Sequence, residues 1–164
     1  IEADVITIAR SQIGHMNWKR KATPKEAPKI FNCSTFIKWV WAQKGVWLPR
    51  RAIQQREFGI PVSLASVQAG DSIFVAGYHA CYYNNPEDGV GHVGILTNAK
   101  SVIHAGGKKK GVNEISLEDF LKSGEFRGAR RYNYDQEPLY TFEYPPEREV
   151  EWSDDFRWLI LENL

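Results

Sequence analysis

The spacing of hydrophobic residues changes along the chain from a helical period to a strand-like one. In the N-terminal third, apolar residues recur three to four positions apart over residues 3–13 and 34–44, which predicts two helices. The basic stretch between them, residues 19–29, is interrupted by two prolines and is expected to be a surface loop. A further short helix is expected at residues 51–57.

Strand-like runs follow these helices. Residues 67–76 pass through a Gly-Asp turn into apolar and β-branched residues, and the runs at 91–98 and 101–106 are separated by a tight connection typical of a hairpin. A capped helix at 117–122 and another strand at 125–132 complete the pattern. Helices followed by an antiparallel meander predict an α+β fold.

The last 32 residues differ from the rest of the chain in charge. Residues 133–164 hold nine acids against two arginines, whereas residues 1–132 hold 19 Lys and Arg against 11 acids. We expect residues 1–132 to form the main domain and residues 133–164 to be an acidic extension that packs on it, either as a lid over a basic cleft or as a stabilising wrap. Residues 133–149 are expected to run extended, and a final helix is expected to begin at Ser153.

Length and composition limit the class of protein. A chain of 164 residues can form one domain with a substantial hydrophobic core. Its two cysteines cannot build a disulfide framework, and no stretch approaches the ~20 consecutive apolar residues that span a bilayer. The chain begins with Ile1 and shows no signal peptide, so the sequence leaves its export open.

Three residues form a candidate catalytic group. Cys33 stands at the predicted N-terminus of the second helix, where unpaired N–H groups and the helix dipole favour a thiolate and can also stabilise an oxyanion. His92 opens a predicted strand and is the candidate base. His104 lies in the partner strand of the hairpin, within reach of His92, and is the candidate for orienting its ring. The predicted triad is Cys33, His92 and His104.

Four segments resemble, in order and spacing, the NlpC-type family of papain-like cysteine peptidases. They are FNCSTFIKWVW, LPRRAIQQREFG, VQAGDSIFVAG and GHVGILTNAKSVIHAG, and the resemblance covers roughly residues 5–122. It implies a papain-like fold in which N-terminal helices pack on an antiparallel sheet. It also implies hydrolysis of amide bonds in peptidoglycan stem peptides, typically between D-glutamate and a diamino acid, through a thioester at Cys33 and without a cofactor or a metal.

The chain departs from the family pattern around the cysteine. Asn32 stands where the family usually has Asp, and Thr35 where it has Gly. The family tyrosine near the oxyanion, some fifteen residues before the cysteine, is replaced by a stretch in which Asn17 or Trp18 can fill the position. With Ser34 and Asn32, these residues are the candidates for lining the substrate cleft, and the departures leave the substrate open.

The expected partner is peptidoglycan or a related peptide, and the expected location is secreted, periplasmic or in the cell envelope. A monomer is favoured. Nucleic acid is not expected, because the basic turn at residues 108–110 comes without a nucleic-acid-binding motif. Two alternatives stay open, namely an amidase or acyltransferase of the same fold acting on a lipid or a protein, and a binding module without turnover. A toxin aimed at another cell's wall would use the same chemistry.

Other polar and aromatic residues are discounted. The His-x-Cys spacing of His79 and Cys81 could suggest a metal site, but two ligands do not make one. The tyrosines within residues 78–83 can instead wall the substrate groove. His15 is expected to be an exposed loop residue, and Arg50 and Asp71 are expected to be structural.

Overall fold

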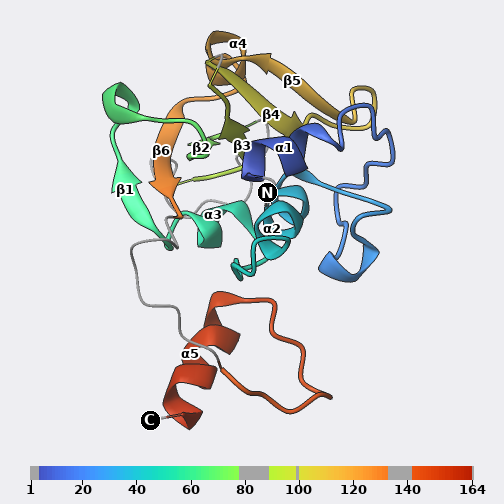
Figure 1. The fold of residues 1–164 in the computed structure, drawn as a ribbon, viewed down its shortest axis with the longest axis vertical. Helices are drawn as coiled ribbons and strands as arrows, with labels where there is room; N and C mark the ends of the chain where they lie inside the picture. Colours follow the sequence, from blue (N-terminus) through green and yellow to red (C-terminus); the bar gives the residue numbers. More distant parts are fainter. Residues whose placement is uncertain (1–3, 78–88, 99, 133–141, 164) are drawn as a thin grey trace.

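Six antiparallel strands form one sheet in the computed structural model, which describes residues 4–77, 89–98, 100–132 and 142–163 (Figure 1). The strand order is β1-β6-β2-β3-β4-β5. The strands are β1 (Ile60–Val62), β2 (Ser72–Val75), β3 (His92–Leu96), β4 (Ser101–Ala105), β5 (Val112–Ser116) and β6 (Phe126–Arg131). All neighbouring strands pair antiparallel.

Most of the helical residues come before the sheet in the chain. The helices are α1 (Val5–Arg10), α2 (Cys33–Ala42), α3 (Ala52–Gln55), α4 (Leu117–Leu121) and α5 (Ser153–Glu162), with 3-10 turns η1 (Pro24–Glu26) and η2 (Leu64–Ser66). This arrangement confirms the predicted α+β class and the antiparallel meander. In the part of the chain that the structure describes, no helix has the length and hydrophobicity needed to cross a membrane.

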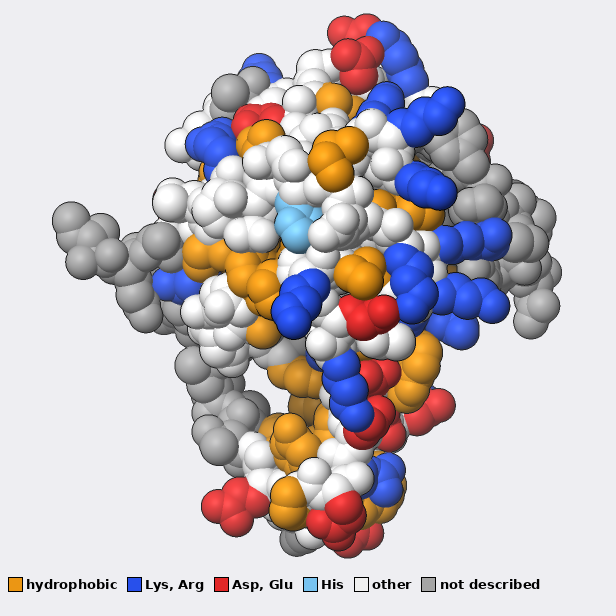
Figure 2. Space-filling view, turned by 90° about the vertical axis from the view of Figure 1, so that its right-hand side faces the viewer, with side chains coloured by type: hydrophobic (Ala, Val, Ile, Leu, Met, Phe, Trp, Pro, Cys, Tyr) orange, Lys and Arg blue, Asp and Glu red, His pale blue; other side chains and the backbone are white. Residues whose placement is uncertain are grey.

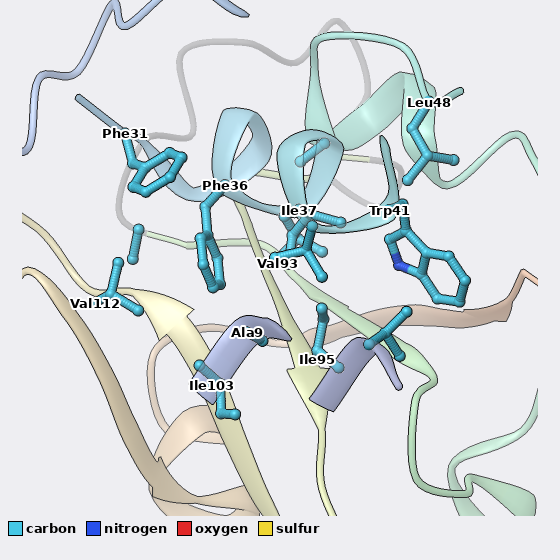
Figure 3. Close-up of a cluster of buried hydrophobic side chains, with 14 of the residues drawn as sticks. Ala9, Phe31, Phe36, Ile37, Trp41, Leu48, Val93, Ile95, Ile103 and Val112 are labelled. Carbon is cyan, nitrogen blue, oxygen red and sulfur yellow. The ribbon is translucent and has the colours of Figure 1, made fainter. Parts of the chain in front are cut away.

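Helix α2 covers one face of the sheet and forms the larger core with it. Phe36 and Ile37 on α2 are fully buried against Val93 and Ile95 of β3 and Ile103 of β4 (Figure 3). Burying one such side chain contributes about 1.5–3 kcal/mol, so this layer is the main anchor of the helix. The N-terminus of α2 is thereby held over the start of β3.

The opposite face of the sheet carries a second, smaller core under α4. Phe120 of α4 is fully buried there with residues of β2, β3, β4 and β6, namely Ile73, Val75, Leu96, Val102 and Ala129. Because side chains alternate between faces along a strand, His92 and Gly94 of β3 share this face with Leu96, whereas Val93 and Ile95 point to α2.

The C-terminal segment contacts the chain just before α3. The backbone N–H of Arg50 donates to the carbonyl of Glu151 at 2.7 Å, and the ring of Trp47 stacks on Phe156 with centroids 5.4 Å apart. Lys25 forms an ion pair with Glu149. Figure 2 shows Asp and Glu side chains gathered at the lower end of the molecule, where Figure 1 places α5, with many Lys and Arg side chains on the body above.

Candidate active site

The start of α2 is fixed by a reciprocal pair of hydrogen bonds around Cys33. The side chain of Asn32, the N-cap residue, accepts from the backbone N–H of Thr35 at 2.9 Å, and the Thr35 hydroxyl accepts from the backbone N–H of Asn32 at 2.9 Å. Such a capping box satisfies two N–H groups that a helix start leaves unpaired. The two positions at which the sequence departs from the NlpC-type pattern therefore bond to each other.

This capping places two of the candidate cleft residues inside the protein. Asn32 also donates to the carbonyl of Arg20 at 3.0 Å, and the Ser34 hydroxyl donates to the Asn32 side chain at 3.2 Å. Both residues are buried. In this structure Asn32 and Ser34 position Cys33, the first residue of the helix.

The thiol of Cys33 lies against the first residues of β3. It is a free, half-buried cysteine whose Sγ is 3.9 Å from the carbonyl oxygen of Gly91. Burial raises the pKa of the Cys33 thiol to about 11, and the backbone N–H groups of Ser34 and Val93 only partly oppose that rise. The sequence-based expectation of a lowered thiol pKa is wrong for the free protein, because the cost of burying a negative charge exceeds the help of the helix N-terminus.

His92 and His104 form a hydrogen-bonded pair. Nε2 of His92 lies 2.7 Å from Nδ1 of His104, and the two rings meet edge to face with centroids 4.9 Å apart. The register of β3 and β4, with Ile95 opposite Ile103, makes these histidines diagonal neighbours on one face of the sheet. The predicted contact between them is confirmed.

Both rings of the pair are neutral at pH 7. Burial, with a smaller contribution from the neighbouring His104, lowers the pKa of His92 to about 3. Burial likewise lowers the pKa of His104 to about 4; contact with Asn113 opposes this effect and the charge of Lys110 adds to it. A single proton therefore lies between the two rings.

Phe120 of α4 packs against both histidines. Its ring centroid lies 5.3 Å from that of His92, with the ring planes inclined by 30°, and 5.3 Å from that of His104, with the planes at right angles. Gly94 makes room for this arrangement, since a Cβ there would lie 2.3 Å from a methyl of Val102 and 3.1 Å from the Phe120 ring. The second core thus holds the histidine pair in place.

Phe120→Ala is expected to lower the free energy of unfolding by about 3–5 kcal/mol and to loosen the histidine pair. Chemical denaturation measures the first effect. The control is Phe74→Ala, because Phe74 is equally buried but lies in the core under α2. Enzymatic activity on a cleavable peptide, expressed per folded molecule, should fall further in Phe120→Ala than in Phe74→Ala. Equal losses in the two variants would contradict a role for Phe120 in holding the histidine pair.

The structure brings Cys33 to the backbone that carries His92. Gly91 and Val93, which flank His92, both contact the Cys33 sulfur. No hydrogen bond joins Sγ to the His92 ring in this described region, and catalytic contacts in ligand-free enzymes are often open in this way. Because His104 occupies Nε2 of His92, Nδ1 is the ring nitrogen that this contact leaves open.

The other two candidate cleft residues run beside the segment that leads to Cys33. Trp18 forms a parallel bridge with Phe31, and the backbone N–H of Phe31 donates to the carbonyl of Asn17 at 3.1 Å. The side chain of Asn17 is exposed, whereas Nε1 of Trp18 is buried and, among the residues described, has no hydrogen-bond partner. The stretch that replaces the family tyrosine therefore lies beside Phe31, which precedes Cys33 by two residues.

Several discounted residues have clear positions. His15 is half-buried and not a free loop residue, since its Nε2 lies 2.9 Å from the Lys29 carbonyl and its ring packs edge-on against Phe31. Asp71 is buried and accepts two bonds of 2.8 Å from Arg131, which agrees with a structural role. His79, Cys81 and the tyrosines within residues 78–83 lie outside the described residues.

Sequence reasoning missed three residues near the site. Phe120 packs on the histidines, Asn113 contacts His104, and the charge of Arg50 lowers the pKa of Cys33. The Arg50 guanidinium also donates to the carbonyl of Ala22. The position of Arg50 in the LPR turn was the one sequence signal available; Phe120 and Asn113 depend on how α4 and β5 pack.

Comparison with known proteins gives consistent matches. The model of the NlpC/P60 family matches residues 19–131. A probable endopeptidase of Corynebacterium glutamicum is 30% identical over 115 residues, covering 70% of this chain and 47% of the relative. A gamma-D-glutamyl-L-lysine dipeptidyl-peptidase of Bacillus cereus is 29% identical over 102 residues, covering 62% of this chain and 29% of the relative.

A solved structure shares the fold. The NlpC/p60 domain of the peptidoglycan hydrolase SagA superposes with a TM-score of 0.60 at 23% identity, covering 77% of this chain and 95% of that domain. The chain spans less than half the length of the two curated relatives described above. The segment matched by the family model, residues 19–131, contains Cys33, His92 and His104.

Proposed function

Because the chain belongs to the NlpC/P60 family, we propose that it hydrolyses amide bonds in peptidoglycan stem peptides, between D-glutamate and a diamino acid, with Cys33 as its nucleophile. The observation that carries this proposal is the half-buried Cys33 thiol at the start of α2, lying against the strand that presents the His92–His104 pair. The names of a peptidoglycan hydrolase and of a gamma-D-glutamyl-L-lysine peptidase among the similar proteins support the substrate class.

The proposed reaction is acyl transfer to water. The proton on Cys33 Sγ moves to Nδ1 of His92 while the sulfur attacks the amide carbonyl carbon, and backbone N–H groups at the start of α2 stabilise the oxyanion. His92 then gives this proton to the departing amine as the C–N bond breaks, which leaves a thioester. Water, deprotonated by His92, cleaves the thioester and restores the thiol.

In the resting state of this mechanism, the Cys33 thiol and the His92 ring are both neutral. The raised pKa of the thiol, about 11, and the lowered pKa of His92, about 3, both disfavour a standing thiolate–imidazolium pair. Burial penalises each charge, so the proton moves only when the substrate carbonyl is in place to receive the sulfur. His104 keeps the His92 ring oriented through the 2.7 Å contact.

Alkylation of Cys33 by iodoacetamide is therefore expected to accelerate about tenfold per pH unit between pH 7 and 9, because the thiolate fraction rises tenfold per unit below the thiol pKa. Mass spectrometry of the Cys33 peptide over a pH series measures this rate, with Cys81 as a second thiol in the same sample. A rate that is already constant at neutral pH would contradict a neutral resting pair.

Incubation with a purified stem peptide tests the function directly. The peptide L-Ala-γ-D-Glu-diamino acid-D-Ala should yield products whose masses place the cleavage after D-glutamate. Intact peptide after prolonged incubation, with a folded protein whose Cys33 still reacts with iodoacetamide, would reject the substrate class.

We also propose that residues 1–132 are the catalytic domain and that residues 133–164 are an acidic extension packed on it. The contacts of Glu151 with Arg50 and of Phe156 with Trp47 support this division. A peptidoglycan substrate further implies action outside the cytoplasm, whether secreted, periplasmic or in the cell envelope.

A further inference from the structure

The histidine pair can hold its proton in two ways, and only one of them supports the proposed chemistry. If Nε2–H of His92 donates to Nδ1 of His104, then Nδ1 of the neutral His92 is unprotonated and can take the proton of Cys33. If Nδ1–H of His104 donates instead, the proton of the neutral His92 is on Nδ1, and the ring cannot act as a base towards the thiol. Something beyond the 2.7 Å contact must select the first arrangement.

The outer nitrogen of His104 is where that selection can be made. In the first arrangement Nε2 of His104 carries a proton and needs an acceptor, whereas in the second it is a lone pair and needs a donor. Nε2 of His104 is buried and has no hydrogen-bond partner within the described ranges. A buried polar group without a hydrogen-bond partner is destabilising, so a nearby acceptor would stabilise the first arrangement.

Asn113 of β5 is the polar side chain placed to supply this acceptor. It stands directly opposite His104 in the β4–β5 register, so the two side chains share a face of the sheet. A Cβ on Gly106 would lie 2.6 Å from Nδ2 of Asn113 and 3.3 Å from Nε2 of His104, which shows that both groups converge over this glycine.

The bonding of the Asn113 amide leaves its oxygen available to accept from His104. Its Nδ2 uses one of its two hydrogens in a bond of 3.1 Å to the carbonyl of Gly111, and the amide oxygen is the acceptor atom that this side chain can offer. Contact with the Asn113 side chain also raises the pKa of His104, as expected of an acceptor facing a ring N–H. The two groups are thus close, although no hydrogen bond to Nε2 is formed in this structure.

We propose that Asn113 is a positioning residue whose amide oxygen accepts Nε2–H of His104, so that His104 presents an unprotonated Nδ1 to His92 and His92 presents an unprotonated Nδ1 to Cys33. This inference rests on the proposed function. During acylation the thiol proton moves to Nδ1 of His92, which becomes an imidazolium and still donates its Nε2–H to His104. No proton leaves His104, so the proposed hydrogen bond from its Nε2–H to Asn113 is the same before and after the thiol proton moves.

Nitrogen-15 NMR of the histidine rings tests the inference without any need for turnover. In the wild-type protein at pH 7, both histidines should be protonated at Nε2 and unprotonated at Nδ1. Asn113→Leu, which removes the acceptor at similar volume, should produce a second population with Nδ1 of His104 protonated. A wild-type His92 protonated at Nδ1, or a folded Asn113→Leu protein with unchanged ring signals, would overturn the inference.

Asn113→Asp is the conservative variant and also covers failure of the leucine variant to fold. Its carboxylate keeps an acceptor, so the wild-type tautomers should persist and the pKa of His104 should rise by about one unit or more. An unchanged His104 titration would show that the side chain does not face the ring and would overturn the inference. Glu114→Gln is the matched control on the same strand, because Glu114 bonds to Arg10 at 3.0 Å and should leave the histidine signals unchanged.

Peptide hydrolysis supplies the second measurement. Asn113→Leu should lower kcat by about tenfold, the factor that one net hydrogen bond is worth, whereas Asn113→Asp should stay within about threefold of the wild type. Equal rates in wild type and Asn113→Leu would count against the inference. If the wild-type protein cleaves no stem peptide, the proposed function fails while the tautomer measurement still decides the role of Asn113.

Discussion

Replacing Cys33 by alanine is expected to lower the hydrolysis of a stem peptide by about 10⁴-fold or more, because the acyl-enzyme can no longer form. The fold should survive, since the capping box of Asn32 and Thr35 fixes the start of α2 without the thiol. Mass spectrometry of L-Ala-γ-D-Glu-diamino acid-D-Ala after incubation measures the loss, and thermal unfolding confirms that the variant is folded.

The control for this experiment is the second cysteine of the chain. Cys81→Ala should cleave the peptide at close to the wild-type rate. Wild-type cleavage by Cys33→Ala would show that another group is the nucleophile. Loss of cleavage in both cysteine variants, together with a lower unfolding temperature, would instead indicate that the substitutions act by destabilising the protein.

The central elements of the fold could be predicted because their sequence patterns agree with their burial. Residues 91–98 and 101–106 were expected to form a hairpin, and β3 and β4 occupy 92–96 and 101–105 with a nearly continuous buried run in each. The expected helix at 34–44 corresponds to α2, whose apolar stripe faces the sheet. Strong periodicity fixes these elements locally, before any tertiary contact is considered.

The two edge strands could not be predicted in this way. β1 is only three residues long, contains a proline and is largely exposed, so it depends on its pairing with β6, in which Ile60 lies opposite Arg131. β5 has the mixed sequence VNEIS and is held by its pairing with β4 and by the hydrogen bond that Arg10 donates to Glu114. Both strands depend on long-range pairing, which a local hydrophobic pattern does not indicate.

The candidate site shows the same division between local and long-range effects. The contact of His92 with His104 could be predicted locally, because the two residues are twelve positions apart in adjacent strands of one hairpin. The pKa of Cys33 could not be predicted locally. Burial raises it in a tertiary setting where the thiol lies against Gly91 and Val93, whereas the helix N-terminus alone favours a lower value. Asn32 and Thr35 likewise appeared as two separate departures from a family pattern, and their joint meaning as a cap required their geometry.

Replacing His92 by glutamine is expected to lower kcat/KM by about 10³-fold or more, because a positioned base contributes about 10²–10⁴-fold and no other base bonds to Cys33 among the described residues. The residual activity should depend on pH in a way that the wild type does not. Without His92 the thiolate must form by ionisation to water, so with a thiol pKa of about 11 the residual rate should rise about tenfold per unit from pH 7 to 9.

The matched control is His15→Gln, since His15 is also half-buried and hydrogen-bonded, through the Lys29 carbonyl, but lies outside the histidine pair. It should retain wild-type activity and a flat pH profile over the same range. Steady-state rates on the stem peptide at each pH measure both variants. A His92→Gln rate within tenfold of the wild type, or one that does not change with pH, would mean that His92 is not the base. The thiolate would then be stabilised by another group, and Arg50, whose charge lowers the pKa of Cys33, would be the first residue to test.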